Sequence, residues 1–103
     1  MSTADTPYLS IDAALQQAID HHQAGRLQQA EQLYRVILQE FPAHSDANHN
    51  LGVLAVQANQ ADSALAHFEA ALNVNPKQPQ YWISYIDTLA RIGDQLAPRY
   101  RYS

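Results

Sequence analysis

One run of residues in this chain recurs, without insertion, at a period of 34 residues. The recurrence pairs small, apolar, aromatic and proline positions: Ala18 with Gly52, Ala30 with Ala64, Tyr34 with Phe68, Ile37 with Ala71, and Pro42 with Pro76. Several residue types repeat together, so the period is not a chance match of one residue. The chain is therefore expected to fold as stacked copies of one unit, each contacting only its neighbours.

The second copy, residues 45–76, carries the fuller pattern. It matches the helical-repeat signature W-x₂-L-G-x₂-Y…A-x₃-F…P at Leu51, Gly52, Ala64, Phe68 and Pro76. Asn48 and Ala55 depart from the large aromatic residues of that signature. Over roughly residues 11–92 the chain resembles the tetratricopeptide repeat (TPR) family. The resemblance implies an all-α fold, a right-handed solenoid of antiparallel helix hairpins with five helices.

Apolar residues at helical spacing predict where these helices lie. We expect helices at residues 11–24, 27–40, 46–58, 61–74 and 80–92. Gly25 and Asn59 follow the first helix of each repeat, where a residue that tolerates positive φ is favoured. Ser10 and Ser45 are the expected N-caps, and Gly93 is expected to end the fifth helix.

The pattern stops after the fifth helix, because Pro98 stands where Ala30 and Ala64 stand in the earlier repeats. A proline inside a helix costs about 3 kcal/mol or more. The expected organisation is therefore a loose leader (1–9), a TPR domain (10–93) and a tail (94–103). Within the domain we expect repeat 1 at 11–44, repeat 2 at 45–78 and a half repeat at 79–93.

The fifth helix is thus predicted to lack its partner. Its positions that normally face the second helix of the same repeat are Trp82, Tyr85, Ile86 and Leu89. Such an apolar strip seldom stays bare on a soluble monomer. We expect a second copy of the chain to cover it, giving a homodimer. Two alternatives remain, a further helix from a longer protein and residues 96–102 folding back.

In TPR domains the first helices of successive repeats line a concave groove, and the resemblance assigns that role to a set of residues here. They are Leu15, Ile19, His22, His49, Asn50, Val53, Val56, Gln57, Ile83, Asp87 and Arg91. Apolar and amide side chains together suit an amphipathic helix or an extended peptide. The alternative is that these residues pack against the leader or the tail.

Two known forms of TPR recognition fit less well. A clamp for a terminal carboxylate needs cations, and of its five equivalent positions only Asn50 matches. Asn50 also matches the asparagine that holds peptide backbone in the TPR superhelix of O-linked N-acetylglucosamine transferases. Repeats of this bacterial style often precede a transferase domain. The alternative function is therefore an N-terminal recognition segment of a larger, glycosyltransferase-like protein.

Composition argues against several other classes of function. The chain has 103 residues, no cysteine and a net charge of −4 with neutral histidines. A disulfide framework and thiolate metal sites are therefore excluded, and the six scattered Lys and Arg residues argue against nucleic-acid binding. No signal peptide or membrane-spanning run is recognisable. We expect a cytoplasmic protein without nucleic-acid or membrane partners.

Catalytic and metal-binding patterns are also missing from the sequence. His21 and His22 are adjacent and diverge on a helix, while His44 and His49 are five residues apart rather than the four that chelate along one face. Neither a glycine-rich phosphate loop nor a nucleophile elbow occurs. The expectation is a protein or peptide partner, no cofactor, no metal and no enzymatic activity.

Overall fold

The structure is a computed structural model that describes residues 10–100 and the side chains of residues 10–95. The leader predicted at 1–9 and residues 101–103 of the predicted tail lie outside this range. Within residues 10–100 every regular element is a helix. The helices are α1 (Ile11–Gln23), α2 (Leu27–Glu40), α3 (Ser45–Gln57), α4 (Ala61–Val74) and α5 (Pro79–Tyr100).

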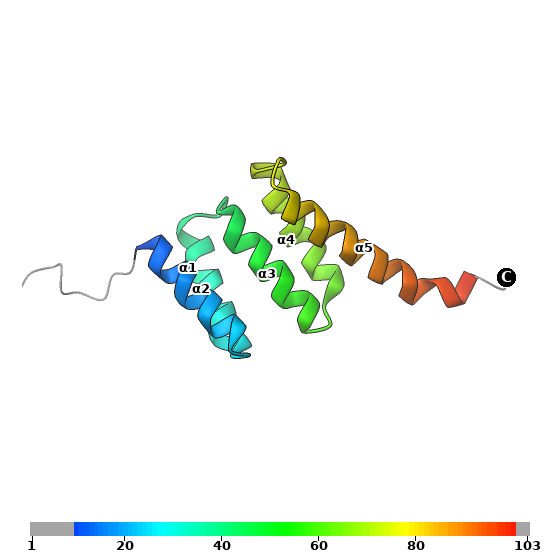
Figure 1. The fold of residues 1–103 in the computed structure, drawn as a ribbon, viewed down its shortest axis with the longest axis horizontal. Coiled ribbons are helices and arrows are strands. Elements are labelled where there is room, and N and C mark those ends of the chain that lie inside the picture. The colour runs from blue at the N-terminus through cyan, green and yellow to red at the C-terminus, as the bar shows by residue number, and fades with distance from the viewer. Residues whose placement is uncertain (1–9, 101–103) are drawn as a thin grey trace, which may run out of the picture.

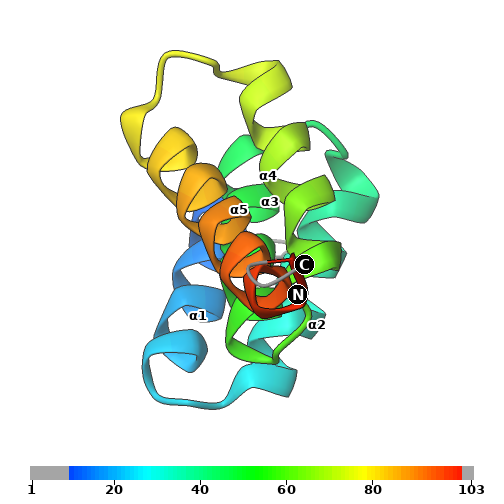
Figure 2. The same ribbon diagram turned by 90° about the vertical axis from the view of Figure 1, so that its right-hand side faces the viewer.

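The helices form a stack of antiparallel hairpins (Figure 1). α1 packs with α2 and α3 with α4, and α3 also contacts α2 while α5 contacts α4. Viewed along the stack, α1 and α5 lie on one side and α2 and α4 on the other (Figure 2). The predicted all-α repeat solenoid is confirmed.

Both hairpin turns have the backbone conformation that the sequence predicted. Gly25 has a φ of 81° and Asn59 a φ of 62°. After each of these residues the chain makes the same bond, because the Arg26 N–H donates to the His21 carbonyl at 2.9 Å and the Gln60 N–H to the Ala55 carbonyl at 2.8 Å. These bonds satisfy carbonyls that a helix end otherwise leaves without partners. The two turns are copies of each other, one period apart.

The N-cap of α1 agrees with the sequence prediction, and the N-cap of α3 differs from it. The Ser10 hydroxyl accepts from the Ala13 N–H at 3.0 Å, as predicted. The prediction that Ser45 caps α3 is wrong, because Ser45 is already helical and His44 is the N-cap. Nδ1 of His44 accepts from the Ala47 N–H at 3.1 Å. A neutral imidazole nitrogen supplies the acceptor that a hydroxyl usually provides.

Small residues let the paired helices approach closely. The Phe68 ring lies over Gly52, where a Cβ would be 2.5 Å from Cε1 of the ring. Phe68 is almost fully buried together with Ala55 and Ala64. This close contact with α4 accounts for a glycine in the middle of α3, and the packing offsets the helix penalty of glycine, about 1 kcal/mol.

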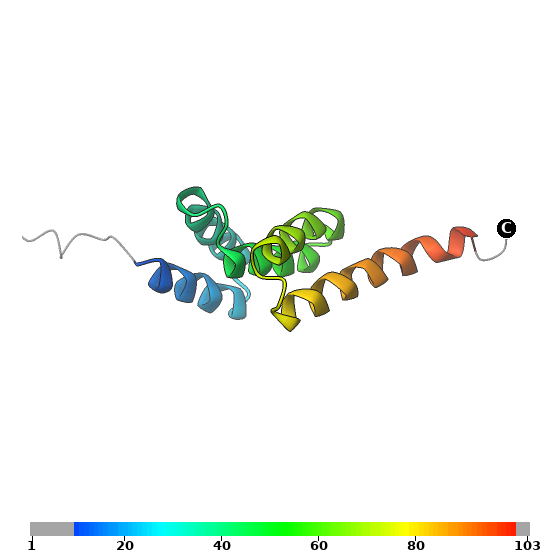
Figure 3. The same cartoon turned by 90° about the horizontal axis from the view of Figure 1, so that it is seen from above.

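The prediction that the fifth helix ends at Gly93 is wrong. α5 continues through Gly93 and Pro98 to Tyr100 and extends past the end of α4 (Figure 3). Gly93 lacks the positive φ found at Gly25, and Asp94 and Gln95 carry on the helix. Glycine is favoured at a helix end where its own φ is positive, and within residues 10–100 the chain does not turn back after Gly93. The expected break at residue 93 is therefore absent.

Candidate functional site

The candidate groove is formed by α1, α3 and α5, the first helices of the successive repeats. Polar side chains join these helices in pairs that are 35 residues apart. His22 Nε2 lies 2.6 Å from Gln57 Oε1 and joins α1 to α3. His49 Nε2 lies 2.8 Å from Ser84 Oγ and joins α3 to α5. These contacts hold adjacent repeats together along the floor of the groove.

His22 also contacts the second helix of its own repeat. Its Nδ1 lies 3.0 Å from the Tyr34 hydroxyl, and the two rings meet edge to face at 5.9 Å. A neutral ring with its proton on Nε2 satisfies both contacts, because Nδ1 then accepts from Tyr34 and Nε2 donates to Gln57. His22 is thus the centre of a three-residue hydrogen-bond chain.

A first cavity of about 400 Å³ opens between α1 and α3. We call it the N-terminal cavity. Its lining residues are Ile19, His22, Gln23, Tyr34, Asn50 and Gln57. Most of these side chains carry hydrogen-bonding groups, so the cavity suits a polar ligand group.

A second cavity of about 240 Å³ opens between α3 and α5. We call it the C-terminal cavity. Its lining residues are Val53, Val56, Gln57, Phe68, Ser84, Asp87, Thr88 and Arg91. Asp87 and Arg91 form a weak, exposed ion pair at 3.6 Å. Because Gln57 lines both cavities, they adjoin along the groove.

His49 was expected in the groove, but the structure buries it in the joint between α3 and α5. Its ring stacks on Tyr81 at a centroid distance of 4.9 Å and lies 5.4 Å from the ring of Phe68. Burial lowers the pKa of His49 below its ordinary value, against smaller opposing effects of the bond to Asn50 and the charge of Asp46. The position favours a neutral ring that stabilises the joint.

The other predicted groove residues divide by burial. Ile19, Asn50, Val53, Val56, Gln57, Asp87 and Arg91 line the two cavities. Leu15 instead packs against the core between the first three helices, and Ile83 is exposed on α5. Leu15 and His49 therefore pack against other residues of the repeats, while the cavity residues remain accessible.

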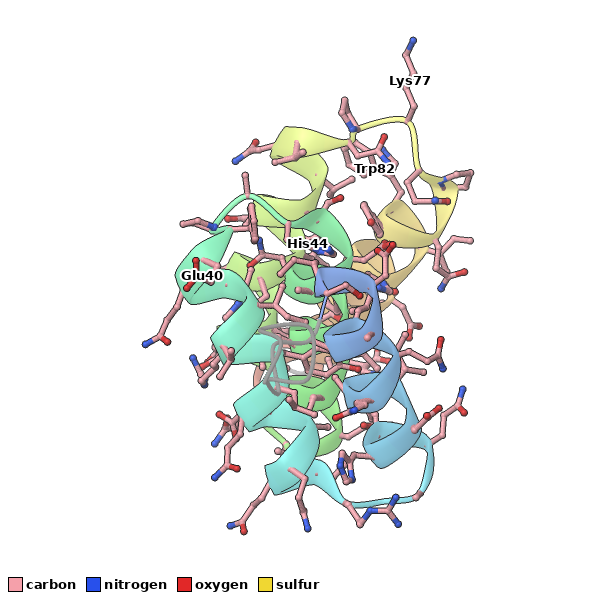
Figure 4. All side chains as sticks on the ribbon, turned by 90° about the vertical axis from the view of Figure 1, so that its left-hand side faces the viewer. Glu40, His44, Lys77 and Trp82 are labelled. Carbon is pink, nitrogen blue, oxygen red and sulfur yellow. The ribbon has the colours of Figure 1, made fainter. Side chains whose placement is uncertain are left out.

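The outer face of α5 is apolar and exposed. Trp82, Ile86 and Leu89 are 42%, 59% and 43% exposed. Tyr85, expected on the same strip, is only partly exposed because it packs against Phe68. Trp82 lies beside the loop that carries Lys77 (Figure 4), where its indole N–H donates to the Pro76 carbonyl at 2.7 Å. The uncovered strip thus consists of Trp82, Ile86 and Leu89.

Two features were missed by the sequence analysis. Tyr34 was identified only as the counterpart of Phe68 in the repeat, but its hydroxyl reaches His22 at the N-terminal cavity. The tyrosine at a position where the second repeat has Phe68 was a usable signal. An apolar cavity of about 540 Å³ also lies at the start of the stack, lined in part by Ile11, Phe41 and Pro42. Phe41 is half exposed there.

The described residues contain neither a cluster of metal ligands nor a helix that could span a membrane. No three His, Asp or Glu side chains there are grouped to hold a metal ion. None of the described helices combines the length and apolarity that crossing a membrane requires.

Comparisons with known proteins place this geometry in context. A family model described as "Tetratricopeptide repeat" matches residues 21–85. Among 38 matching chains of solved structures is one described as "MamA D159K mutant 2", with a TM-score of 0.71 and 19% identity. The match covers 95% of this chain and 54% of that one, so this chain spans about half of its length. At this identity the likeness shows the fold. No curated protein matches the sequence.

Proposed function

The chain belongs to the tetratricopeptide repeat family, and on that premise we propose that the groove of α1, α3 and α5 binds an extended peptide segment of a protein partner. The family fold serves protein–protein interaction and is generally non-catalytic, so the chain is an interaction module. The alternative, a recognition segment of a larger transferase, gains no support from the comparisons.

The observation that carries the proposal is the pair of adjoining cavities on the groove side. Both are lined mainly from α1, α3 and α5, and both combine an aliphatic side chain with polar groups. Ligand sites in proteins have this composition, an apolar surface with a few polar groups that fix orientation. Because the two cavities adjoin at Gln57, a bound peptide can run from one repeat to the next.

A direct test is the selection of binders from a random dodecapeptide library, followed by fluorescence polarisation with the enriched peptides. Val53→Arg places a charged side chain in the groove and is expected to weaken binding at least tenfold. Val36→Arg is the matched control, because Val36 lies exposed on α2, away from both cavities, and should leave affinity unchanged. Asn50→Ala is a milder groove variant for the case that Val53→Arg disturbs folding. Equal affinity of all four proteins would refute groove binding.

We also propose that the strip of Trp82, Ile86 and Leu89 is a self-association surface. The α3 residues one period earlier are Asn48, Gly52 and Ala55. All three residues are buried. Gly52, for example, lies beneath the Phe68 ring of α4. The corresponding face of α5 is exposed and more apolar, so covering it with a partner surface is favourable.

Ile86 decides what kind of surface can cover the strip. It stands where the earlier repeats have Ala18 and Gly52, and at Gly52 even one added carbon would meet the Phe68 ring. A helix docked on α5 as α4 docks on α3, with an aromatic at that point, would therefore clash with Ile86. The strip suits a partner that packs at a wider separation.

The two ends of the solenoid favour a symmetric contact. At the start of the stack, Gln17 and Asp20 are exposed where the next repeat has Leu51 and Leu54 buried. Head-to-tail stacking would place the apolar strip on this polar face. A contact between the α5 strips of two copies instead buries one apolar surface against another, with the copies related by a two-fold axis. Three half-exposed side chains supply roughly 300 Å² per copy, well below the ~800 Å² per partner of stable complexes, so a weak dimer is expected.

Sedimentation velocity over a range of protein concentrations tests this second proposal. The wild-type protein should show a rising average mass, and Trp82→Ser should remain monomeric at the same concentrations. Phe41→Ser is the matched control, since Phe41 is an equally exposed aromatic residue outside α5. A wild-type protein that stays monomeric throughout, or a Trp82→Ser variant that associates normally, would contradict the assignment.

A further inference from the structure

The two groove cavities are copies of one another in sequence position. The residues that line the N-terminal cavity are Ile19, His22, Gln23, Tyr34, Asn50 and Gln57. Adding one period of 34 residues to each gives Val53, Val56, Gln57, Phe68, Ser84 and Arg91, all of which line the C-terminal cavity. The repeat has therefore produced the same pocket twice, and any difference in what the pockets bind comes from the substitutions between them.

Those substitutions make the N-terminal cavity polar. His22 stands where the second cavity has Val56, and Tyr34 where it has Phe68. The oxygen of the Gln57 amide contacts His22 at 2.6 Å, while both N–H donors of this amide remain for a ligand. Asn50, also in the lining, carries both a donor and an acceptor. A ligand side chain with an acceptor and donors of its own matches this set.

The C-terminal cavity is different because Val56 and Phe68 replace His22 and Tyr34, and because its two hydroxyl groups are engaged within the protein. The Ser84 hydroxyl contacts His49 at 2.8 Å, and the Thr88 hydroxyl donates to the Ser84 carbonyl at 2.8 Å. Asp87 and Arg91 contact each other at the surface. The remaining lining consists of two valines, the Phe68 ring and Gln57, which this cavity shares with the other. Because Val56 and Phe68 stand here in place of His22 and Tyr34, the smaller cavity suits an aliphatic side chain.

The step between the cavities sets the spacing of the two side chains. Neighbouring helices pack at about 10 Å, and a polyproline II segment rises about 3.1 Å per residue with three residues per turn. Side chains at positions i and i+3 of such a segment therefore point the same way, about 9 Å apart. We infer that the groove selects an extended segment with an aliphatic residue and an asparagine or glutamine three positions apart, the aliphatic residue entering the C-terminal cavity.

This inference rests on the proposed groove binding and is tested by changing one pocket into the other. The His22→Val/Tyr34→Phe double variant gives the N-terminal cavity two of the side chains of its copy. Removing the whole hydrogen-bond chain of His22 with apolar groups of similar shape leaves no buried partner without a bond, because Gln57 is exposed to water. Circular dichroism checks that the variant folds.

The probes are the dodecapeptide library and two fluorescent peptides that differ only at the polar anchor, Asn against Leu. The wild-type protein should enrich the aliphatic–amide pattern and bind the Asn peptide about tenfold more tightly. The double variant should reduce this preference, because Asn50 and Gln57 remain while the pocket becomes more apolar, and it should enrich aliphatic residues at the polar anchor. If both proteins show the same preference, or if enriched peptides lack the spacing, the inference is wrong while groove binding stands. If no peptide binds the wild-type protein better than Val53→Arg, groove binding itself fails and the inference with it.

Discussion

Replacing Gly52 by alanine isolates the close contact on which the second hairpin depends. A Cβ at this position would lie 2.5, 2.7 and 3.0 Å from three atoms of the Phe68 ring. Carbon atoms pack best at about 3.5–4.0 Å, so the ring or the helices must shift by about 1 Å. Phe68 is 1% exposed, so its neighbours hold the ring in place although it borders the C-terminal cavity.

The expected magnitude follows from two opposing effects. Overpacking a well-filled core costs about 1–3 kcal/mol, whereas removing a glycine from a helix interior gains up to about 1 kcal/mol. Gly52→Ala should therefore lower the free energy of unfolding by about 1 kcal/mol. For a domain of this size that corresponds to a fall in Tm of about 4–8 °C.

Gly93→Ala is the matched control, because Gly93 is also helical but has no neighbour within 4 Å of an added Cβ. It should raise the free energy of unfolding by up to about 1 kcal/mol. Urea denaturation followed by circular dichroism measures both variants. Adding Phe68→Leu to Gly52→Ala should cost less than the sum of the two single changes, because the leucine vacates the contact. Equal stabilisation by both glycine replacements would refute the proposed packing role of Gly52.

Two further predictions concern the joint between repeats and the second turn. Burial lowers the pKa of His49, so its contribution to stability is complete above the unfolded-state value near 6.5 and is lost as the pH falls below it. Urea denaturation at pH 7 and pH 5 should show a smaller loss for His49→Gln than for the wild-type protein, and an equal loss would contradict burial of the ring. Asn59 has a φ of 62°, so Asn59→Ala should lower the free energy of unfolding by about 1 kcal/mol, while Asn59→Gly should not, and matching effects of these two changes would exclude strain at this turn.

The fold was predictable because its main determinants are local or periodic. Gly25 and Asn59 were identified as the turn residues from their place after each first helix, and Gly52 and Phe68 were identified as positions of the repeat signature. The end of the fifth helix was not predictable in this way. Gly93 would end the helix only if a following helix packed back against α5. No local sequence pattern reports whether such packing occurs.

The site was predicted less completely for a related reason. The repeat indicates which positions face the groove, but it does not show which of them meet across repeats. His49 faces α5, and its stacking on Tyr81 depends on two residues that share no repeat position. Tyr34 illustrates the opposite case, since one hydroxyl that distinguishes it from Phe68 changes the character of a whole cavity. Differences between copies are therefore more informative about binding than the features they share.

The identity of the two turns has a consequence for how such a molecule can grow. Arg26 and Gln60 each follow a residue with positive φ, and each N–H donates to the carbonyl five residues earlier. The backbone geometry at the first turn is therefore interchangeable with that at the second. A tandem duplication of the segment between them would insert one whole unit, and recombination out of register between the two copies would delete one. After either event the new connection between helices would have the same turn as the existing ones. A change in the number of repeats therefore requires no new loop structure.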